Sequence, residues 1–186
     1  MNLRYLIGFL GIIALIILVI VLIVRAGGGS TVGPKAIDLA DYITNSSEVS
    51  LTIDGPVSAD QTHHSIHITV DENRATAELI KGYEGQIEDS KSYATNENSY
   101  ANFILALKHA GFTVGNTGDS LKDERGYCAT GVRYVYQLKD NGKEVRRFWN
   151  TSCGRDGTYK GMGELTRTLF QQQIPDYDEL ASPSGF

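Results

Sequence analysis

The sequence lacks the short motifs that mark the common catalytic classes. No serine stands in a nucleophile elbow, and no cysteine and histidine are placed as in a thiol enzyme. The glycine-rich stretch 154–163 has the spacing of neither a P-loop nor a dinucleotide-binding turn. No internal repeat is present either. We therefore identify no catalytic residue and expect no cofactor, although carboxylates that the fold brings together would leave no such motif.

Acidic residues are absent from the first 25 positions. All 22 of them lie beyond Arg25, together with 15 of the 17 basic residues, so the rest of the chain carries 15 − 22 = −7. Nucleic-acid phosphates and anionic lipid headgroups repel a surface of that sign. Neither is expected as a partner of this part of the chain.

Charge is also absent from residues 5–24, YLIGFLGIIALIILVIVLIV. Twenty apolar residues make a helix about 30 Å long, which matches the hydrocarbon core of a bilayer. We interpret residues 1–25 as a transmembrane signal anchor. A secretory signal cleaved after Ala26 is the alternative, although its apolar core would be longer than the roughly 7–15 residues that are usual.

Cysteine is scarce: Cys128 and Cys153 are the only two. An even pair in a membrane-tethered domain suggests a disulfide and an oxidising compartment. Basic residues flank the apolar run almost evenly, so charge does not orient the chain. The cysteine pair and the short amino-terminal tail favour a cell-membrane protein whose carboxy-terminal domain lies outside the cytoplasm. Glycosylation motifs at Asn45 and Asn150 fit that location, but such short motifs also arise by chance.

Beyond the anchor the sequence predicts one α+β domain. Residues 26–35 are rich in glycine and predict a flexible linker, 36–175 a small two-layer domain, and 176–186 a flexible tail. Helical spacing appears over 98–110, with an apolar face, and again around Met162, Leu165, Leu169 and Phe170. A short helix is also possible within 36–44. A period of two predicts strands over 49–53, 66–70, 76–81 and 86–91. We expect a mostly antiparallel sheet with two amphipathic helices on one face.

A hairpin is predicted around Asn141-Gly142, between β-type runs at 127–138 and 145–152. We expect a type I turn with Gly142 as a left-handed bulge residue and Lys139 facing Lys143. One further bulge in the first strand, near Gly131, would bring Cys128 opposite Cys153. A two-residue turn would need two such shifts. On this basis a Cys128–Cys153 disulfide clamps the open end of the hairpin.

Two groups of residues are candidates for binding. Arg155 and Lys160, in the glycine-rich stretch before the second helix, are a possible anion site. The aromatic residues Tyr134, Tyr136, Trp149 and Tyr159 would form a partner-binding surface if exposed, and part of the core otherwise.

The histidines at 63, 64 and 67 resemble a metal-binding motif only on a helix. On a strand, His63 and His67 stand about 13 Å apart, and His64 points to the other face. One zinc ion, with bonds of about 2 Å, cannot join them, so we predict no metal site.

These features favour a membrane-anchored extracytoplasmic binding or scaffold module whose partner is a protein or another cell-surface ligand. The bilayer itself is the partner of residues 5–24. The alternatives are an envelope hydrolase with carboxylates assembled by the fold, and an accessory subunit of a membrane protein complex.

Overall fold

The computed structural model describes residues 37–118, 121–154 and 157–185, all of which belong to one compact unit, Ile37–Phe186. No helix in these ranges is long and apolar enough to cross a membrane, and the predicted anchor at 5–24 and linker at 26–35 lie outside them. Along the chain the elements are η1 (Leu39–Tyr42), β1 (Ser47–Asp54), η2 (Asp60–Thr62), β2 (His64–Asp71), β3 (Arg74–Lys81), β4 (Gln86–Ala94), α2 (Glu97–His109), β5 (Arg133–Asp140), β6 (Lys143–Thr151), α3 (Gly163–Gln171), α4 (Tyr177–Ala181) and η4 (Ser182–Ser184).

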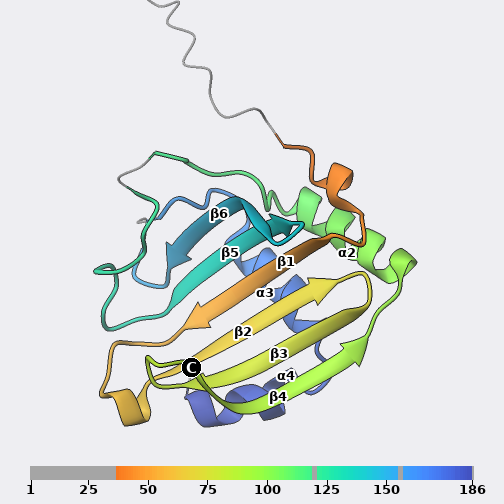
Figure 1. Ribbon diagram of the computed structural model, residues 1–186. Coiled ribbons are helices and arrows are strands. Elements are labelled where there is room, and N and C mark those ends of the chain that lie inside the picture. The colour runs from red at the N-terminus through yellow and green to blue at the C-terminus, as the bar shows by residue number, and fades with distance from the viewer. Residues whose placement is uncertain (1–36, 119–120, 155–156, 186) are drawn as a thin grey trace, which may run out of the picture. The chain divides into compact units, whose positions relative to one another are not determined.

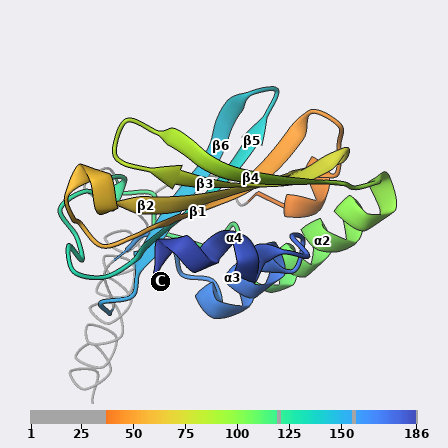
Figure 2. The ribbon, with the colours of Figure 1, turned by 90° about the horizontal axis from the view of Figure 1, so that it is seen from below.

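A single six-stranded sheet organises the domain, with strand order β4-β3-β2-β1-β5-β6 and every neighbouring pair antiparallel (Figure 1). Helices α2, α3 and α4 all lie on one face of the sheet (Figure 2). The buried aliphatic residues of β1, β2 and β3 recur at every second position and pack toward these helices. The mostly antiparallel sheet with helices is therefore confirmed.

Helix α2 carries the clearest local signals. The Asn96 side chain accepts a hydrogen bond from the Ser99 N–H, which caps the amino end. At the other end Gly111 has φ +74°, and the Phe112 N–H donates to the Leu107 carbonyl, as in a Schellman motif. The predicted apolar face is confirmed: Tyr100, Phe103, Ile104 and Leu107 are all buried.

Shortening Ile104 to valine tests this helix–sheet contact. Ile104 is fully buried, so removing one methyl group should lower the free energy of unfolding by about 0.5–1.5 kcal/mol. The same substitution at Ile87, which is 54% exposed on β4, is the matched control and should be nearly neutral. Chemical denaturation that gave equal losses for the two variants would contradict the packing described for α2.

Helix α3 exposes two residues that the sequence assigned to its apolar face. Met162 and Leu165 are exposed, while Thr166 and Phe170 are buried. Thr166 tolerates burial because its hydroxyl lies 2.7 Å from the Tyr159 hydroxyl and donates to the Met162 carbonyl. The helix is therefore rotated relative to the predicted face.

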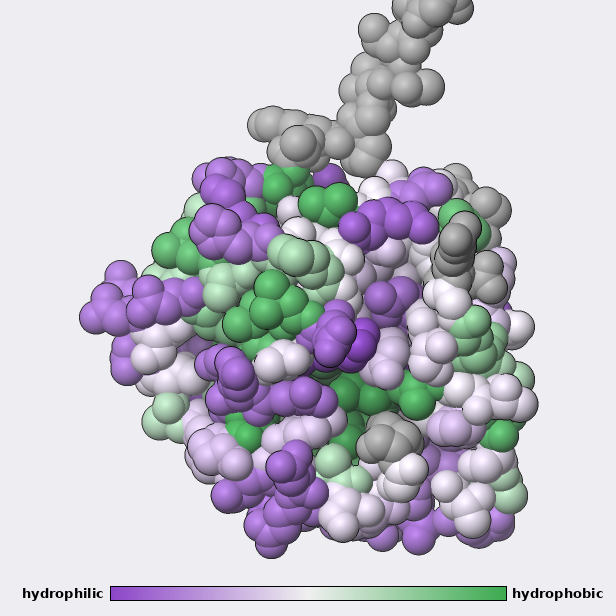
Figure 3. All heavy atoms as spheres, turned by 180° about the vertical axis from the view of Figure 1, so that it is seen from behind, coloured by the Kyte–Doolittle hydropathy of each residue, from purple (hydrophilic) through white to green (hydrophobic). Residues whose placement is uncertain are grey.

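Seen from the helix side, the surface mixes hydrophobic and hydrophilic residues (Figure 3).

The β5–β6 hairpin has a different register from the expected one. Asn141 and Gly142 have φ +50° and +71° and form a two-residue turn, so Asp140, and not Lys139, faces Lys143. Positive φ at both turn residues matches the right-handed twist of the strands. The register then shifts in β6, where Leu138 faces Arg146. The predicted type I turn was wrong, and the bulge lies in the second strand.

The carboxy-terminal segment is not the frayed tail that its composition suggested. Residues 177–181 form α4, and Leu180 is fully buried in the core cluster. The Lys91 ammonium lies 3.7 Å from the Glu179 carboxylate, and Tyr93 donates to Asp176. Burial of Leu180 thus packs this short acidic segment against the sheet.

Candidate functional site

Most of the aromatic residues proposed as a partner-binding surface lie in the interior. Tyr136, Trp149 and Tyr159 are buried, and the Tyr136 and Tyr159 rings lie 4.2 Å apart. Tyr134 is half-buried, and the Arg167 guanidinium lies 4.3 Å above its ring. Burial is the main reason that the pKa of Tyr159 is raised. These rings therefore belong to the core, which was the alternative interpretation of the pattern.

The proposed anion site lies only partly within the described residues. Lys160 is exposed, whereas Arg155 lies outside the described ranges. Two of the glycines serve packing: a Cβ at Gly157 would come 2.4 Å from the Trp149 carbonyl, and one at Gly161 would come 2.4 Å from the Gly111 carbonyl. The chain is therefore closely packed at these two positions, and anion binding remains a prediction.

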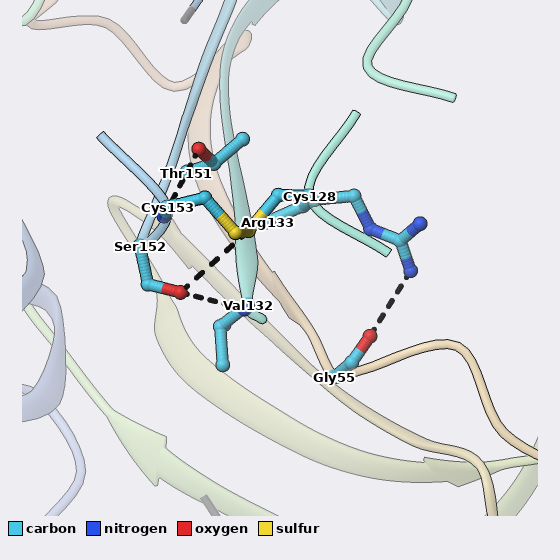
Figure 4. The surroundings of a disulfide bond; sticks show 7 residues. All are labelled: Gly55, Cys128, Val132, Arg133, Thr151, Ser152 and Cys153. Carbon is cyan, nitrogen blue, oxygen red and sulfur yellow. Dashed lines mark hydrogen bonds between the residues drawn. A yellow bond between two sulfur atoms is a disulfide. The ribbon is translucent and has the colours of Figure 1, made fainter. Parts of the chain in front are cut away.

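The disulfide joins Cys128 and Cys153 across the open end of the hairpin, with their Cα atoms 5.6 Å apart (Figure 4). Cys128 reaches this position through a turn in which the Gly131 N–H donates to its carbonyl. A Cβ at Gly131 would lie 2.6 Å from the Cys128 sulfur and 3.0 Å from the Cys153 sulfur. Gly131 is therefore needed as space for the disulfide, and not as the predicted bulge.

A cluster of charged side chains lies near the disulfide. The Arg133 guanidinium is 2.7 Å from the Asp54 carboxylate and also donates to the Gly55 carbonyl at 3.0 Å. His63 Nε2 lies 3.0 Å from the other Asp54 oxygen, and the His63 ring stacks on Tyr83 at 4.1 Å. We call Asp54, His63 and Arg133 the charge cluster; it joins β1, the start of β2 and β5.

The contacts of the charge cluster hold three segments of the chain together. His63 Nδ1 faces the Pro56 carbonyl at 3.2 Å while Nε2 faces Asp54, so neither ring nitrogen is free to take a proton from a substrate. Both Asp54 oxygens are also engaged. Burial raises the pKa of Asp54, and the charges of Arg133 and then His63 act against this shift. Among the described residues this cluster does not provide a general base.

The sheet face opposite the helices carries a group of hydroxyl side chains among charged ones such as Glu48, Glu78 and Lys139. The alternation that buries the aliphatic residues places the following residues on this face, which we call the hydroxyl face: Ser50, Thr52, Ser65, Thr69, Thr76, Ser90 and Ser92. Strand pairing aligns four of them in one row across the sheet, in the order Ser92, Thr76, Thr69, Ser50. Ser50 is buried, Thr69 and Thr76 are half-buried, and Ser92 is exposed, so the row opens to solvent toward β4.

His67 lies in the next row of the same face. Its two ring nitrogens are each 3.0 Å from a hydroxyl, Nδ1 from Thr52 and Nε2 from Thr69. Burial is the largest cause of its lowered pKa, with Glu78 acting in the opposite direction. A neutral imidazole here makes hydrogen bonds to uncharged neighbours. Within the described ranges no group of three or more potential ligands could hold a metal ion, and His63 and His67 do not converge.

No protein-family model matches the chain, and a search of curated proteins found no match. Two features were missed from the sequence: the charge cluster, whose members are far apart in the chain, and the hydroxyl face. The second had a visible signal, because Ser and Thr occupy the polar positions of each alternating strand.

Proposed function

We propose that the chain is a membrane-anchored binding or scaffold module that presents its α+β domain outside the cytoplasm. The observation that carries the proposal is the one-sided sheet: helices cover one face, and no described helix covers the hydroxyl face. At β5 and β6 a loop covers this face: Trp149 is buried there, its ring N–H donates to the Leu121 carbonyl, and the Tyr127 ring lies 4.8 Å from it. Over β1–β4 the hydroxyl face is a preformed surface for a partner.

The location outside the cytoplasm is supported by the disulfide together with the apolar run at 5–24. Disulfides persist in oxidising compartments and are rare in the cytosol. The run is long enough for one span of a bilayer. Both features fit a single-pass cell-membrane protein.

The chemistry of the hydroxyl face points to a protein partner that offers hydrogen-bonding groups more than charge. Glu48 is already paired with Lys139 at 2.9 Å, and the middle row from Ser92 to Ser50 has no charged side chain. Hydroxyls both donate and accept, so they suit backbone and amide groups of a second protein.

Photo-crosslinking in the native cells tests the proposal. A photoreactive residue at Thr76, on the hydroxyl face, should give a defined adduct with another protein, whereas one at Thr168, exposed on α3, should not. The adduct should stay in the membrane pellet after a carbonate wash. Adducts from Thr168 alone, or none from Thr76, would contradict the binding surface. A mature amino terminus at Gly27, or release by carbonate, would contradict the anchor.

A further inference from the structure

Strand β4 forms one edge of the sheet and is exposed along most of its length. Eight of its nine residues pair with β3, and Glu88 is left unpaired where the register shifts. Within the described ranges no other strand pairs with the outer side of β4. Exposed edges of this length can pair with a strand from another chain. The chemistry of this edge therefore decides what it pairs with.

The hydrogen-bond pattern shows which β4 residues point their backbone groups outward. The Thr95 N–H donates to the Asn73 carbonyl at 3.0 Å, so the ladder begins there with a hydrogen-bonded pair. Hydrogen-bonded and non-hydrogen-bonded pairs alternate in an antiparallel ladder. Counting along the regular register, Ser90 and Glu78 form a non-hydrogen-bonded pair. The N–H and C=O of Ser90 therefore point away from β3.

A side-chain hydrogen bond agrees with this assignment. The Ser90 N–H donates to the Asp89 carboxylate at 2.7 Å, a partner outside the ladder. In the single chain, Asp89 thus accepts the hydrogen bond that the Ser90 N–H would donate to an added strand. On the same face Lys91 carries the opposite charge, two residues further along.

We propose that β4 pairs with β4 of a second copy of this chain, antiparallel, around a two-fold axis through Ser90. In this register Ser90 faces the partner's Ser90, and Asp89 faces the partner's Lys91 on both sides of the axis. Opposite charges directly across a strand pair stabilise it, and like charges destabilise it. Centring the axis on Lys91 would set lysine against lysine, and centring it on Asp89 would set aspartate against aspartate. The charges therefore select the Ser90 register.

The dimer has a continuous sheet with the helices of both copies on the same side, and it does not depend on the proposed hydroxyl-face partner. Asp89 exchanges its bond to the Ser90 N–H for the partner's Lys91, whose ammonium group lies 3.7 Å from the Glu179 carboxylate in the single chain and is shared between the two carboxylates in the dimer. One pair of short strands buries little surface, so the association is weak and is best detected by covalent trapping.

Cysteine trapping tests the register in the full-length protein. Ser90→Cys places two thiols in facing positions about 5.5 Å apart at Cα, within disulfide range. Mild oxidation in detergent should give a covalent dimer on a non-reducing gel. Ser92→Cys is the matched control, because it puts the same thiol on the same edge and the same face of the sheet. Its two copies stand about 13 Å apart in this register and should not form a bond. Equal trapping at both positions, or trapping at neither, would overturn the proposal.

Charge reversal separates edge pairing from any association through residues 5–24. In the Ser90→Cys background, Asp89→Lys sets lysine against lysine and Lys91→Asp sets aspartate against aspartate, so each variant alone should lose the covalent dimer. Mixing the two, with tags of different size, restores both opposite-charge pairs and should give only the mixed dimer. Trapping that is indifferent to these charges, or no dimer on mixing, would refute the pairing.

Discussion

Replacing Arg133 with methionine should lower the free energy of unfolding by about 3–5 kcal/mol. Arg133 is 6% exposed, and its guanidinium contacts the Asp54 carboxylate and the Gly55 carbonyl. Removing one partner leaves the Asp54 charge half-buried without its guanidinium, which costs far more than losing a surface pair. Methionine keeps much of the side-chain volume, so the loss reports the charge and not a cavity.

The loss should also depend on pH. Burial already raises the pKa of Asp54, and Arg133 is the largest influence that lowers it, so the variant should raise that pKa further. A carboxyl whose folded-state pKa exceeds its unfolded value loses stability as pH rises through the folded pKa. The deficit relative to wild type should therefore be small below pH 4, near the ordinary pKa of aspartate, and grow as pH rises above it.

Denaturant titrations of the wild-type and variant proteins at two pH values provide the measurement. Arg74→Met is the matched control, because Arg74 is exposed at the start of β3, and it should be nearly neutral at both values. A deficit for Arg133→Met that is equal at both pH values would show that the side chain acts by packing and not by its charge.

The repeating parts of the fold could be predicted from the sequence. Period-two alternation located the first four strands, and helical spacing with Asn96 and Gly111 at the ends located α2 within a residue or two. These signals are local, since each is produced by neighbours in the chain. They are the part of the fold for which no long-range contact must be known.

The register of the β5–β6 pair and the burial of individual aromatic rings could not be predicted in the same way. The bulge in β6 shifts the pairing by one residue, and nothing in the local sequence distinguishes it from a bulge in β5. Tyr134 and Tyr136 lie on the same face, yet Tyr136 is buried against Tyr159, while Tyr134 is half-buried with Arg167 over its ring. Such differences depend on which helix lies over which strand.

The charge cluster illustrates the limit for functional residues. Asp54, His63 and Arg133 come from three segments, and in the sequence His63 stands out only as part of a histidine motif. The structure places His63 before β2, with its ring against Tyr83 and each nitrogen bonded. Pairing of β1 with β5 sets Asp54 opposite Arg133, and pairing of β1 with β2 brings His63 close to Asp54. The long-range pairing of β1 with β5 leaves no trace in any one stretch of sequence.

Breaking the Cys128–Cys153 disulfide should destabilise the domain by about 3–4 kcal/mol in the chain-entropy model, for a sequence separation of 25. The bond closes the β5–β6 hairpin at its open end and restricts the unfolded chain. It also holds the segment whose Ala129 carbonyl accepts a hydrogen bond from the Val57 N–H, which links the loop after β1 to the hairpin. Reduction should therefore weaken the packing of the open end of the β5–β6 hairpin and of the loop after β1.

Two measurements separate the covalent constraint from the packing of the cysteine side chains. The Cys128→Ser/Cys153→Ser variant and the reduced wild-type protein should show the same loss in denaturant titrations, because both lack the bond. Gly131→Ala should give an intermediate loss while the bond is present, since its Cβ would approach the Ser152 hydroxyl and both sulfurs. After reduction the loss should be smaller, because the sulfurs can move apart and only the Ser152 contact remains. A reduced wild type as stable as the oxidised protein would mean that strand pairing alone, and not the disulfide, holds this end of the hairpin.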